Sequence, residues 1–237
     1  MQCIVCGNDK SFSQFHTIKK EDDVYLKKEI KYYRCEDCRF EFVYPQRKEE
    51  LAELYRKEYR DEVSLKNRVI YILPYSKRHR YAFRLLKHLK KGKMLDIGSA
   101  EGKFAYLMKF RGWDVTCVEP TEHYAQFARK MFGLHVIPKR LEEVPITDKY
   151  DLVTLSTVLE HVFDPISILK LCRSFLNENG KIYIRVPNVL SRHYASTHLF
   201  LFTEDTLRTI LAKCGLVMTK YEVHNNEMYV LAEKTKP

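Results

Sequence analysis

Four of the seven cysteines in the chain form two closely spaced pairs. Cys3 and Cys6 make one Cys-x-x-Cys pair, and Cys35 and Cys38 make the other. Each pair places two thiols on one tight turn, and four thiolates satisfy the tetrahedral coordination that zinc adopts at structural sites. The spacing therefore predicts a structural zinc ion held by these four residues. A rubredoxin-like iron site and redox-active thiols are the alternatives.

A glycine-containing loop after a short apolar stretch is the next candidate for chemistry. The residues of interest in this loop are Asp96, Gly98, Ser99 and Gly102. Glycine lets the backbone turn sharply and approach a ligand without a Cβ clash. Loops of this kind between a strand and a helix bind phosphates or nucleosides. By itself the pattern is weak, because Ala100 occupies the middle of a Gly-x-Ala-x-Gly arrangement and a glycine of the dinucleotide-binding pattern is missing.

An acidic residue follows the next apolar stretch at a suggestive distance. Glu119 lies 23 residues after Asp96, near the spacing at which an acidic side chain meets ribose hydroxyls. A carboxylate suits this role because it accepts two hydrogen bonds from a vicinal diol. The alternative is a solvent-exposed glutamate at the end of a strand.

Together these motifs resemble those of the class I S-adenosylmethionine-dependent methyltransferases. The first motif of that family matches residues 95–102, the second matches Glu119, and the fourth matches residues 150–162. Residues 159–165 are especially similar to small-molecule methyltransferases of the ubiquinone-biosynthesis type. The resemblance covers about residues 90–235 and implies S-adenosylmethionine as the methyl donor.

The resemblance also implies which residues bind the cofactor. They follow the strands of the expected sheet and divide according to the part of the cofactor they face. The methionine moiety would be surrounded by Asp96, Gly98, Ser99 and Gly102, with Ser156 and Thr157 facing its end. Glu119 would bind the ribose, Pro120 would lie beside the adenine, and Leu141 would offer its backbone amide to the adenine.

Two histidines are candidates for the catalytic step. An acceptor that is a hydroxyl or a carbon acid must lose a proton when it is methylated, and histidine, with an ordinary pKa of about 6.5, suits a general base. His161 lies at the position that faces the acceptor in many relatives, and His198 lies on the loop that covers the substrate in this family. We expect both to be catalytic. The alternative for each is packing or helix capping.

The elements that must position these residues alternate regularly along the chain. Strands are predicted at 94–97, 114–119, 134–137, 150–156 and 181–186, and helices at 102–111, 124–132, 165–176 and 204–214. Two further strand-like runs, 216–223 and 227–232, have no helix between them and could pair as a hairpin. The pattern predicts an α/β fold with a doubly wound, parallel sheet. The family resemblance makes this a Rossmann-like, seven-stranded sheet ending in an antiparallel hairpin.

The first part of the chain has a different character. Residues 1–45 hold both cysteine pairs and predict a small zinc ribbon, 46–90 predict a helical linker or cap with helices at 47–62 and 76–89, and 91–237 form the expected methyltransferase domain. This arrangement resembles zinc-ribbon methyltransferases found among sugar-nucleotide and polysaccharide-modifying enzymes. The resemblance implies a sugar or nucleotide-sugar as the acceptor.

Composition limits the classes of protein and of partner. The chain lacks an apolar run near the roughly 18 residues that span a bilayer and a signal-peptide pattern, so we expect a cytoplasmic protein. The odd number of cysteines disfavours a disulfide framework. The formal net charge of +10 favours an anionic small-molecule acceptor.

Two other functions are weighed against a small-molecule methyltransferase. An RNA methyltransferase would use the ribbon and the basic stretch 77–80 to hold its substrate. A non-catalytic module would keep Glu119 and the glycines but need no base. The sequence does not indicate the oligomeric state.

Overall fold

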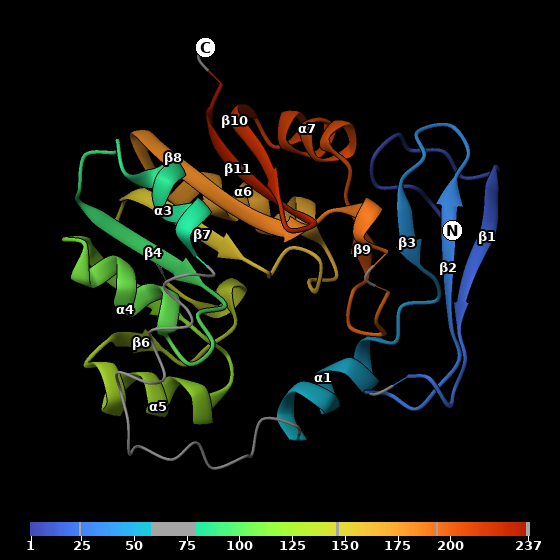
Figure 1. The fold of residues 1–237 in the computed structure, drawn as a ribbon, viewed down its shortest axis with the longest axis horizontal. Coiled ribbons are helices and arrows are strands. Elements are labelled where there is room, and N and C mark those ends of the chain that lie inside the picture. The colour runs from blue at the N-terminus through green and yellow to red at the C-terminus, as the bar shows by residue number, and fades with distance from the viewer. Residues whose placement is uncertain (24, 58–78, 146, 193, 236–237) are drawn as a thin grey trace.

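A seven-stranded sheet forms the centre of the larger part of the molecule (Figure 1). The computed structural model describes residues 1–23, 25–57, 79–145, 147–192 and 194–235. The sheet has the strand order β10-β11-β8-β7-β4-β5-β6. Its strands are β4 (Lys93–Ile97), β5 (Asp114–Val118), β6 (His135–Ile137), β7 (Tyr150–Ser156), β8 (Leu176–Pro187), β10 (Leu216–His224) and β11 (Glu227–Lys234).

The direction of these strands confirms the predicted Rossmann-like topology. Strands β6, β5, β4, β7 and β8 are parallel, and β11 is antiparallel to both β8 and β10. The last two strands form the expected hairpin. Strand β8 begins at Leu176, earlier than predicted, because α6 ends at Phe175 and Leu176 already pairs with Tyr150 of β7.

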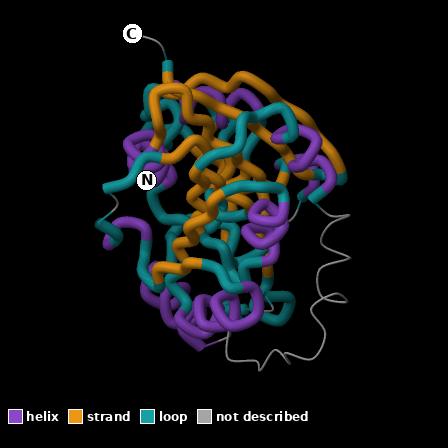
Figure 2. Tube along the Cα trace, turned by 90° about the vertical axis from the view of Figure 1, so that its left-hand side faces the viewer, coloured by secondary structure: helices purple, strands orange, loops and turns teal. Residues whose placement is uncertain are grey.

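Helices cover both faces of the sheet, as the view in Figure 2 also shows. They are α3 (Arg80–Leu86), α4 (Lys103–Phe110), α5 (Glu122–Phe132), α6 (Pro165–Phe175) and α7 (Glu204–Lys213). Strand β4 serves both layers, because Met94 packs into the core with α3, α4 and α5, whereas Leu95 packs into the core with α6 and α7. Burial on both faces explains why apolar residues occupy consecutive positions in these strands, as Met94 and Leu95 do in β4.

The helix ends carry recognisable local signals. Asp164 precedes α6 and accepts a hydrogen bond from the Ser167 backbone N–H at 3.0 Å, while Pro165 occupies the first turn. Gly133 ends α5 in the left-handed conformation. These ends fix where the chain turns back toward the sheet.

A smaller, four-stranded sheet contains the N-terminal residues and one strand from far along the chain. It consists of β1 (Phe12–Ile18), β2 (Ile30–Cys35), β3 (Glu41–Val43) and β9 (Phe200–Leu201), in that order. Strand β9 follows β8 and lies beside β3 (Figure 1), where Phe42 pairs with Phe200. The ring of Phe40 also stacks on that of Phe200 with centroids 5.7 Å apart. One hydrophobic core therefore runs from the small sheet to the face covered by α6 and α7.

The segment between the two sheets is described only in part. Helix α1 spans Lys48–Lys57, where the described part of the predicted helix 47–62 ends. Helix α3 ends at Leu86, so the helix predicted at 76–89 stops three residues earlier than expected. The basic residues Lys77 and Arg78 lie outside the described residues. Two short 3-10 helices, η2 (Leu141–Glu143) and η3 (Val189–Ser191), also occur among the described residues.

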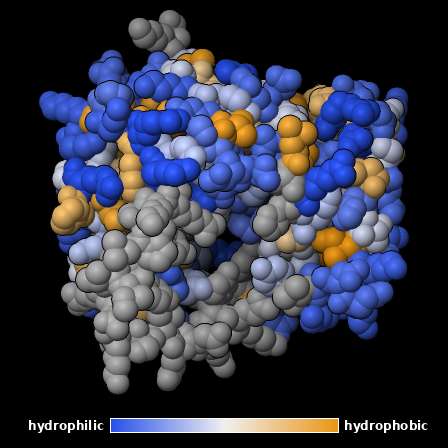
Figure 3. Space-filling view, in the orientation of Figure 1, coloured by the Kyte–Doolittle hydropathy of each residue, from blue (hydrophilic) through white to orange (hydrophobic). Residues whose placement is uncertain are grey.

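The surface of the described residues bears on whether the protein could cross a membrane. Within the described ranges, none of the helices combines the length and apolar character needed to cross a bilayer. The face in Figure 3 is largely hydrophilic, with hydrophobic side chains in small, separate patches.

Candidate active site and candidate metal centre

The glycine loop joins the end of β4 to the start of α4. Gly98 and Gly102 have φ angles of +64° and +77°, in the left-handed region. A Cβ at Gly98 would lie 2.7 Å from Cγ2 of Val158, and one at Gly102 would lie 2.6 Å from Cδ1 of Leu134. Both positions therefore exclude side chains on two independent grounds, conformation and space. The turn directs the loop toward the first backbone N–H groups of α4, which favour electronegative ligand atoms.

The side chain of Glu119 binds this loop directly. One carboxylate oxygen accepts a hydrogen bond from the Ala100 backbone N–H and the other from the Thr121 backbone N–H, each at 2.8 Å. The side chain is almost fully buried, and burial raises the pKa of Glu119 above its ordinary value. Ala100 has a φ of +48°, which is costly for a residue with a Cβ. The two motifs predicted separately thus form one structural unit.

Asp96 lies close by, near the end of β4, and is also buried. The hydroxyl of Thr154 on β7 donates a hydrogen bond to its carboxylate at 2.5 Å. Burial, with a smaller contribution from the negative charge of Glu119, raises the pKa of Asp96 to about 7. Two buried carboxyl groups at neighbouring strand ends favour a ligand that carries positive charge and hydroxyl donors.

The other predicted cofactor residues follow the same strands. Ser99 is buried in the loop, and Pro120 is exposed after β5. Ser156 is the last residue of β7, Thr157 follows it, and both are half-buried. Leu141 is buried in η2 after β6. Thr157 has a φ of +57°, and its backbone N–H donates to the Arg185 carbonyl at 2.8 Å. Since β4, β5, β6 and β7 are parallel, these residues share the carboxyl edge of the sheet, where ligands of such folds bind.

The two predicted catalytic histidines are neighbours. His161 lies in the turn after β7 and His198 in the loop before β9, with ring centroids 4.9 Å apart. Nδ1 of His161 lies 2.8 Å from the Thr197 carbonyl oxygen, so that nitrogen carries the proton and the lone pair is on Nε2. Burial, with a contribution from His198, lowers the pKa of His161 to about 4. The imidazole is therefore neutral at pH 7.

The loop that carries His198 is held from two directions. The Leu199 backbone N–H donates to the Glu160 carbonyl at 2.8 Å. From the small sheet, the hydroxyl of Tyr32 contacts the carbonyl oxygens of Ala195 at 2.7 Å and His198 at 3.0 Å. Tyr32 is fully buried, and no motif or spacing along the chain predicts this role. The N-terminal sheet thus positions a residue of the candidate active site.

Glu160 is a further site residue that sequence reasoning missed. Its side chain is 1% exposed, and neither carboxylate oxygen has a hydrogen-bond partner among the residues that the structure describes. Burial raises the pKa of Glu160 to about 8. Its place directly before His161 was the one signal in the sequence, and it did not show that the side chain points inward.

The four cysteines of the two pairs converge in the small sheet. Their sulfur atoms all lie within 4.8 Å of one another. The Sγ atoms of Cys3 and Cys38, and those of Cys6 and Cys35, are 3.5 Å apart and unbonded. Each pair closes a tight turn through a 2.8 Å backbone hydrogen bond, from Gly7 to Cys3 and from Arg39 to Cys35. The arrangement can hold one tetrahedral metal ion.

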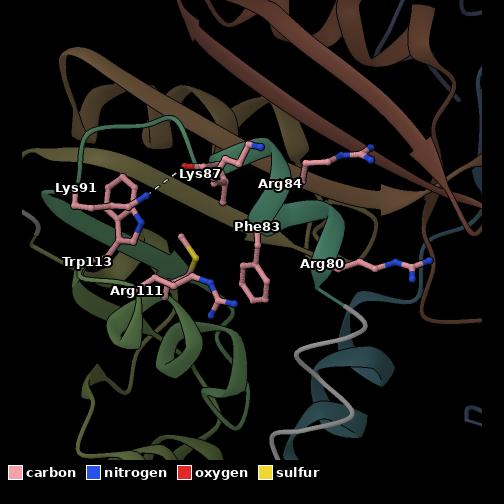
Figure 4. Close-up of a pocket in the computed structure, with 9 residues that line it drawn as sticks. Arg80, Phe83, Arg84, Lys87, Lys91, Arg111 and Trp113 are labelled. Carbon is pink, nitrogen blue, oxygen red and sulfur yellow. Dashed lines mark hydrogen bonds between the residues drawn. The ribbon is translucent and has the colours of Figure 1, made fainter.

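A basic groove lies toward the other end of the strands (Figure 4). It has a volume of about 520 Å³ and is lined by Arg80, Phe83, Arg84, Leu86, Lys87, Lys91, Met108, Arg111 and Trp113. Lys91 lies over the ring of Trp113 at 5.0 Å, and Arg111 lies over the ring of Phe83 at 3.5 Å. Because Lys91 and Trp113 precede β4 and β5, the groove begins at the edge opposite the glycine loop.

Comparisons with known proteins agree with this arrangement. The family model described as a methyltransferase domain matches residues 69–221. The ubiquinone biosynthesis O-methyltransferase of Acinetobacter baylyi is 29% identical over 114 residues, covering 43% of this chain and 46% of that protein. The Histophilus somni protein of the same name is 30% identical over 111 residues, covering 42% and 47%. The matched stretch thus spans less than half of these relatives.

Solved structures resemble the fold at low identity. The CcbJ methyltransferase from Streptomyces caelestis has a TM-score of 0.60 and 11% identity, covering 68% of this chain and 90% of that one. The magnesium protoporphyrin IX methyltransferase from Synechocystis PCC 6803, solved with bound SAH, has a TM-score of 0.57 and 15% identity, covering 75% and 91%. At these identities the likeness shows the fold alone.

Proposed function

Because the chain belongs to the class I S-adenosylmethionine-dependent methyltransferases, we propose that it transfers a methyl group from this cofactor to a small-molecule acceptor. The observation that carries the proposal is the unit formed by the glycine loop, Glu119 and Asp96 at the carboxyl edge of the sheet. Bound S-adenosylmethionine would supply an electrophilic methyl group on a positively charged sulfur.

The chemistry of the donor set fits this cofactor. S-adenosylmethionine carries a sulfonium, an ammonium and a ribose diol, and the site offers two buried carboxyl groups. In the proposed arrangement Glu119 accepts hydrogen bonds from the ribose hydroxyls, while Asp96 with Gly98, Ser99, Gly102, Ser156 and Thr157 surrounds the methionine end. Pro120 and the backbone of Leu141 border the adenine. Binding of a cation favours the ionised form of Asp96 and offsets the cost of burying its charge.

The acceptor belongs on the side of His161 and His198. His161 is neutral at pH 7, with its lone pair on Nε2, so it can take a proton from an acceptor hydroxyl. His198 lies beside His161, with ring centroids 4.9 Å apart, and the Tyr32 hydroxyl orders its loop. We therefore propose both histidines as the residues that handle the acceptor and its proton.

The cysteine cluster is proposed as a structural zinc site within an N-terminal ribbon of residues 1–45. Tetrahedral zinc with Zn–S bonds of about 2.3 Å places sulfur atoms roughly 3.8 Å apart, close to the observed spacing. Cys35 ends β2, the strand that carries Tyr32. Bound zinc would thereby stabilise the strand that anchors the His198 loop.

We propose a sugar or nucleotide-sugar as the acceptor. Support comes from the formal charge of +10, which attracts anionic molecules, and from the combination of a ribbon with this catalytic fold. We also propose that residues 46–90 form a helical linker or cap and that residues 91–237 form the methyltransferase domain.

Calorimetry with S-adenosylmethionine, followed by turnover assays with a panel of sugars, nucleotide-sugars, phenols and amines, tests the function. We expect micromolar binding, and release of S-adenosylhomocysteine with at least one acceptor class. Glu119→Gln should weaken cofactor binding by at least about tenfold, because it removes one charge-assisted hydrogen bond to the ribose. Absence of cofactor binding by the wild-type protein would refute the proposal, and binding without turnover for any acceptor would favour a non-catalytic module.

RNA methylation stays as a second candidate because of the basic groove. Lys87, Lys91 and Arg111 line it together. Burial lowers the pKa of Lys91, and the charge of Arg111 makes a smaller contribution in the same direction. A groove that binds RNA phosphates would show retention that falls steeply with salt. Lys87→Ala with Lys91→Ala should then abolish RNA retention, whereas small-molecule turnover should be unaffected by the same change.

A further inference from the structure

The side chains of Glu160, His161 and His198 form a cluster of metal-ligating groups distant in sequence from the cysteines. One ligand atom from each lies within 4.8 Å of the others. Oε1 of Glu160 is 3.9 Å from Nε2 of His161. Metal–ligand bonds of about 2.1 Å place ligand atoms roughly 3 to 3.5 Å apart. Side-chain rotations that move the ligand atoms by about 1 Å would therefore let all three bind one ion.

Glu160 supplies the strongest indication that a cation belongs here. Its carboxyl group is 1% exposed and lacks a hydrogen-bond partner within the described part of the chain, which is costly for any buried polar group. Arg185 is the nearby cation, but its guanidinium forms two hydrogen bonds with Glu227, at 2.8 and 2.5 Å. The charge of Arg185 is therefore matched by Glu227. The carboxyl group of Glu160 instead lies beside the ring of His161.

The histidines are oriented as metal ligands commonly are. The Nδ1–H of His161 donates to the Thr197 carbonyl at 2.8 Å, which fixes the tautomer and presents Nε2 toward Glu160. The neighbouring His198 is held through its own carbonyl by the Tyr32 hydroxyl and through the Leu199–Glu160 backbone hydrogen bond. These hydrogen bonds hold the ring of His161 and the backbone at His198 in place before any ion binds.

We propose that Glu160, His161 and His198 bind a divalent transition-metal ion whose remaining coordination positions face the methyl acceptor. Two imidazoles and one carboxylate are a ligand set used by catalytic zinc and by other divalent metals with open positions. The inference rests on the proposed methyl transfer, because two of the three ligands lie in the turn after β7, the strand that ends at Ser156. It narrows the acceptor to molecules with two neighbouring oxygen atoms, such as a vicinal diol or a phosphorylated sugar.

Such an ion would change the part played by the histidines. Coordination lowers the pKa of a bound hydroxyl, so the acceptor oxygen would lose its proton to solvent more readily. His161 and His198 would then act as ligands rather than as bases. The metal would also orient the acceptor oxygen, which is the geometric requirement of methyl transfer.

Titration of the full-length, zinc-loaded protein with Co²⁺ tests the site. Zinc bound by four thiolates is closed and retained, so added Co²⁺ reports the proposed site. We expect one further equivalent to bind, with the weak visible bands of nitrogen and oxygen ligands and without thiolate-to-cobalt charge transfer. Glu160→Gln and His198→Ala should each weaken Co²⁺ binding by at least about tenfold.

The matched control is His135→Ala, which removes an exposed histidine at the start of β6. It should leave the Co²⁺ titration unchanged, and the unfolding transition of each variant, followed by the fluorescence of Trp113, verifies that the sheet is intact. Wild-type protein that binds no further equivalent, or variants that bind Co²⁺ as tightly as wild type, would overturn the inference.

Calorimetry with S-adenosylmethionine on the same samples separates this inference from the proposed function. Protein that binds the cofactor but no added Co²⁺ refutes the metal site alone. Protein that binds Co²⁺ at these residues but not the cofactor refutes the methyltransferase proposal and leaves a metal site of other purpose.

Discussion

Replacing Asp96 with asparagine should stabilise the cofactor-free protein while weakening cofactor binding. Asp96 is buried at the end of β4, and burial raises its pKa to about 7 from an ordinary value of 3.8. The folded protein therefore holds this proton more tightly than the unfolded chain. Stability from the neutral form is fully present below pH 3.8 and is lost as the pH rises through about 7. Asparagine is neutral at every pH and still accepts the Thr154 hydrogen bond.

The size of the effect follows from the shift. Each pKa unit corresponds to about 1.4 kcal/mol, so a shift of about three units costs the folded wild-type protein roughly 4 kcal/mol at pH 8. At pH 5 most of that cost is absent. The unfolding free energy of Asp96→Asn, minus that of wild type, should therefore grow by roughly 3 kcal/mol between pH 5 and pH 8.

The single tryptophan makes the measurement specific to the larger sheet. Trp113 is buried immediately before β5, in the core shared with α3, α4 and α5. Urea unfolding followed by its fluorescence, without cofactor and at several pH values, reports the domain that contains Asp96. Thr154→Val is a useful companion, because it removes the hydroxyl that stabilises the Asp96 carboxylate and should accentuate the wild-type pH dependence.

Parallel pH profiles for wild type and Asp96→Asn would refute the reasoning, since they would show that Asp96 has the same pKa in the folded and unfolded states. Calorimetry supplies the second half of the test. A cationic cofactor binds the ionised carboxyl more tightly, so wild-type affinity should rise between pH 6 and pH 8, and the variant should lack this rise.

Three further predictions concern other parts of the structure. Tyr32→Phe removes the hydroxyl that holds the His198 loop and should lower turnover by about tenfold or more without shifting the unfolding of the larger sheet; unchanged turnover would contradict the anchoring role. Gly98→Ala places a Cβ 2.7 Å from Val158 at a φ of +64° and should weaken cofactor affinity by more than about tenfold in calorimetry, a loss that Val158→Ala should reverse only in part because the backbone strain persists. Cys35→Ser should eliminate bound zinc in elemental analysis, whereas Cys214→Ser, which lies outside the cluster, should retain it.

The larger sheet was predictable because its signals are local. Each strand from β4 to β8 contains a short apolar run, and each helix carries an apolar face, so the order of elements and the final hairpin could be read along the chain. The four-stranded sheet was not predictable to the same degree. Strand β9 has two residues and no periodicity of its own, and it is defined by pairing with Glu41 and Phe42.

Some residues of the candidate site could likewise be predicted from the sequence, and others could not. The glycine loop and Glu119 have a spacing that predicts their proximity, and the structure joins them through the Ala100 hydrogen bond. Glu160 and Tyr32 have no such spacing. Whether Glu160 points into the protein depends on the turn after β7, and the contact of Tyr32 with His198 depends on how two sheets pack, so tertiary structure alone reveals them.

The pairing of β9 with β3 also orders events during synthesis. Phe42 emerges from the ribosome roughly 160 residues before Phe200, an interval of about 8 to 30 s at ordinary elongation rates. Throughout that interval β3 is an uncovered edge strand next to Phe40, the kind of surface that recruits other nascent chains. Early metal capture by the cysteines would fix the first three strands, but the last strand must wait for the catalytic fold. The four-stranded sheet can therefore be completed only after about 200 residues have been synthesised.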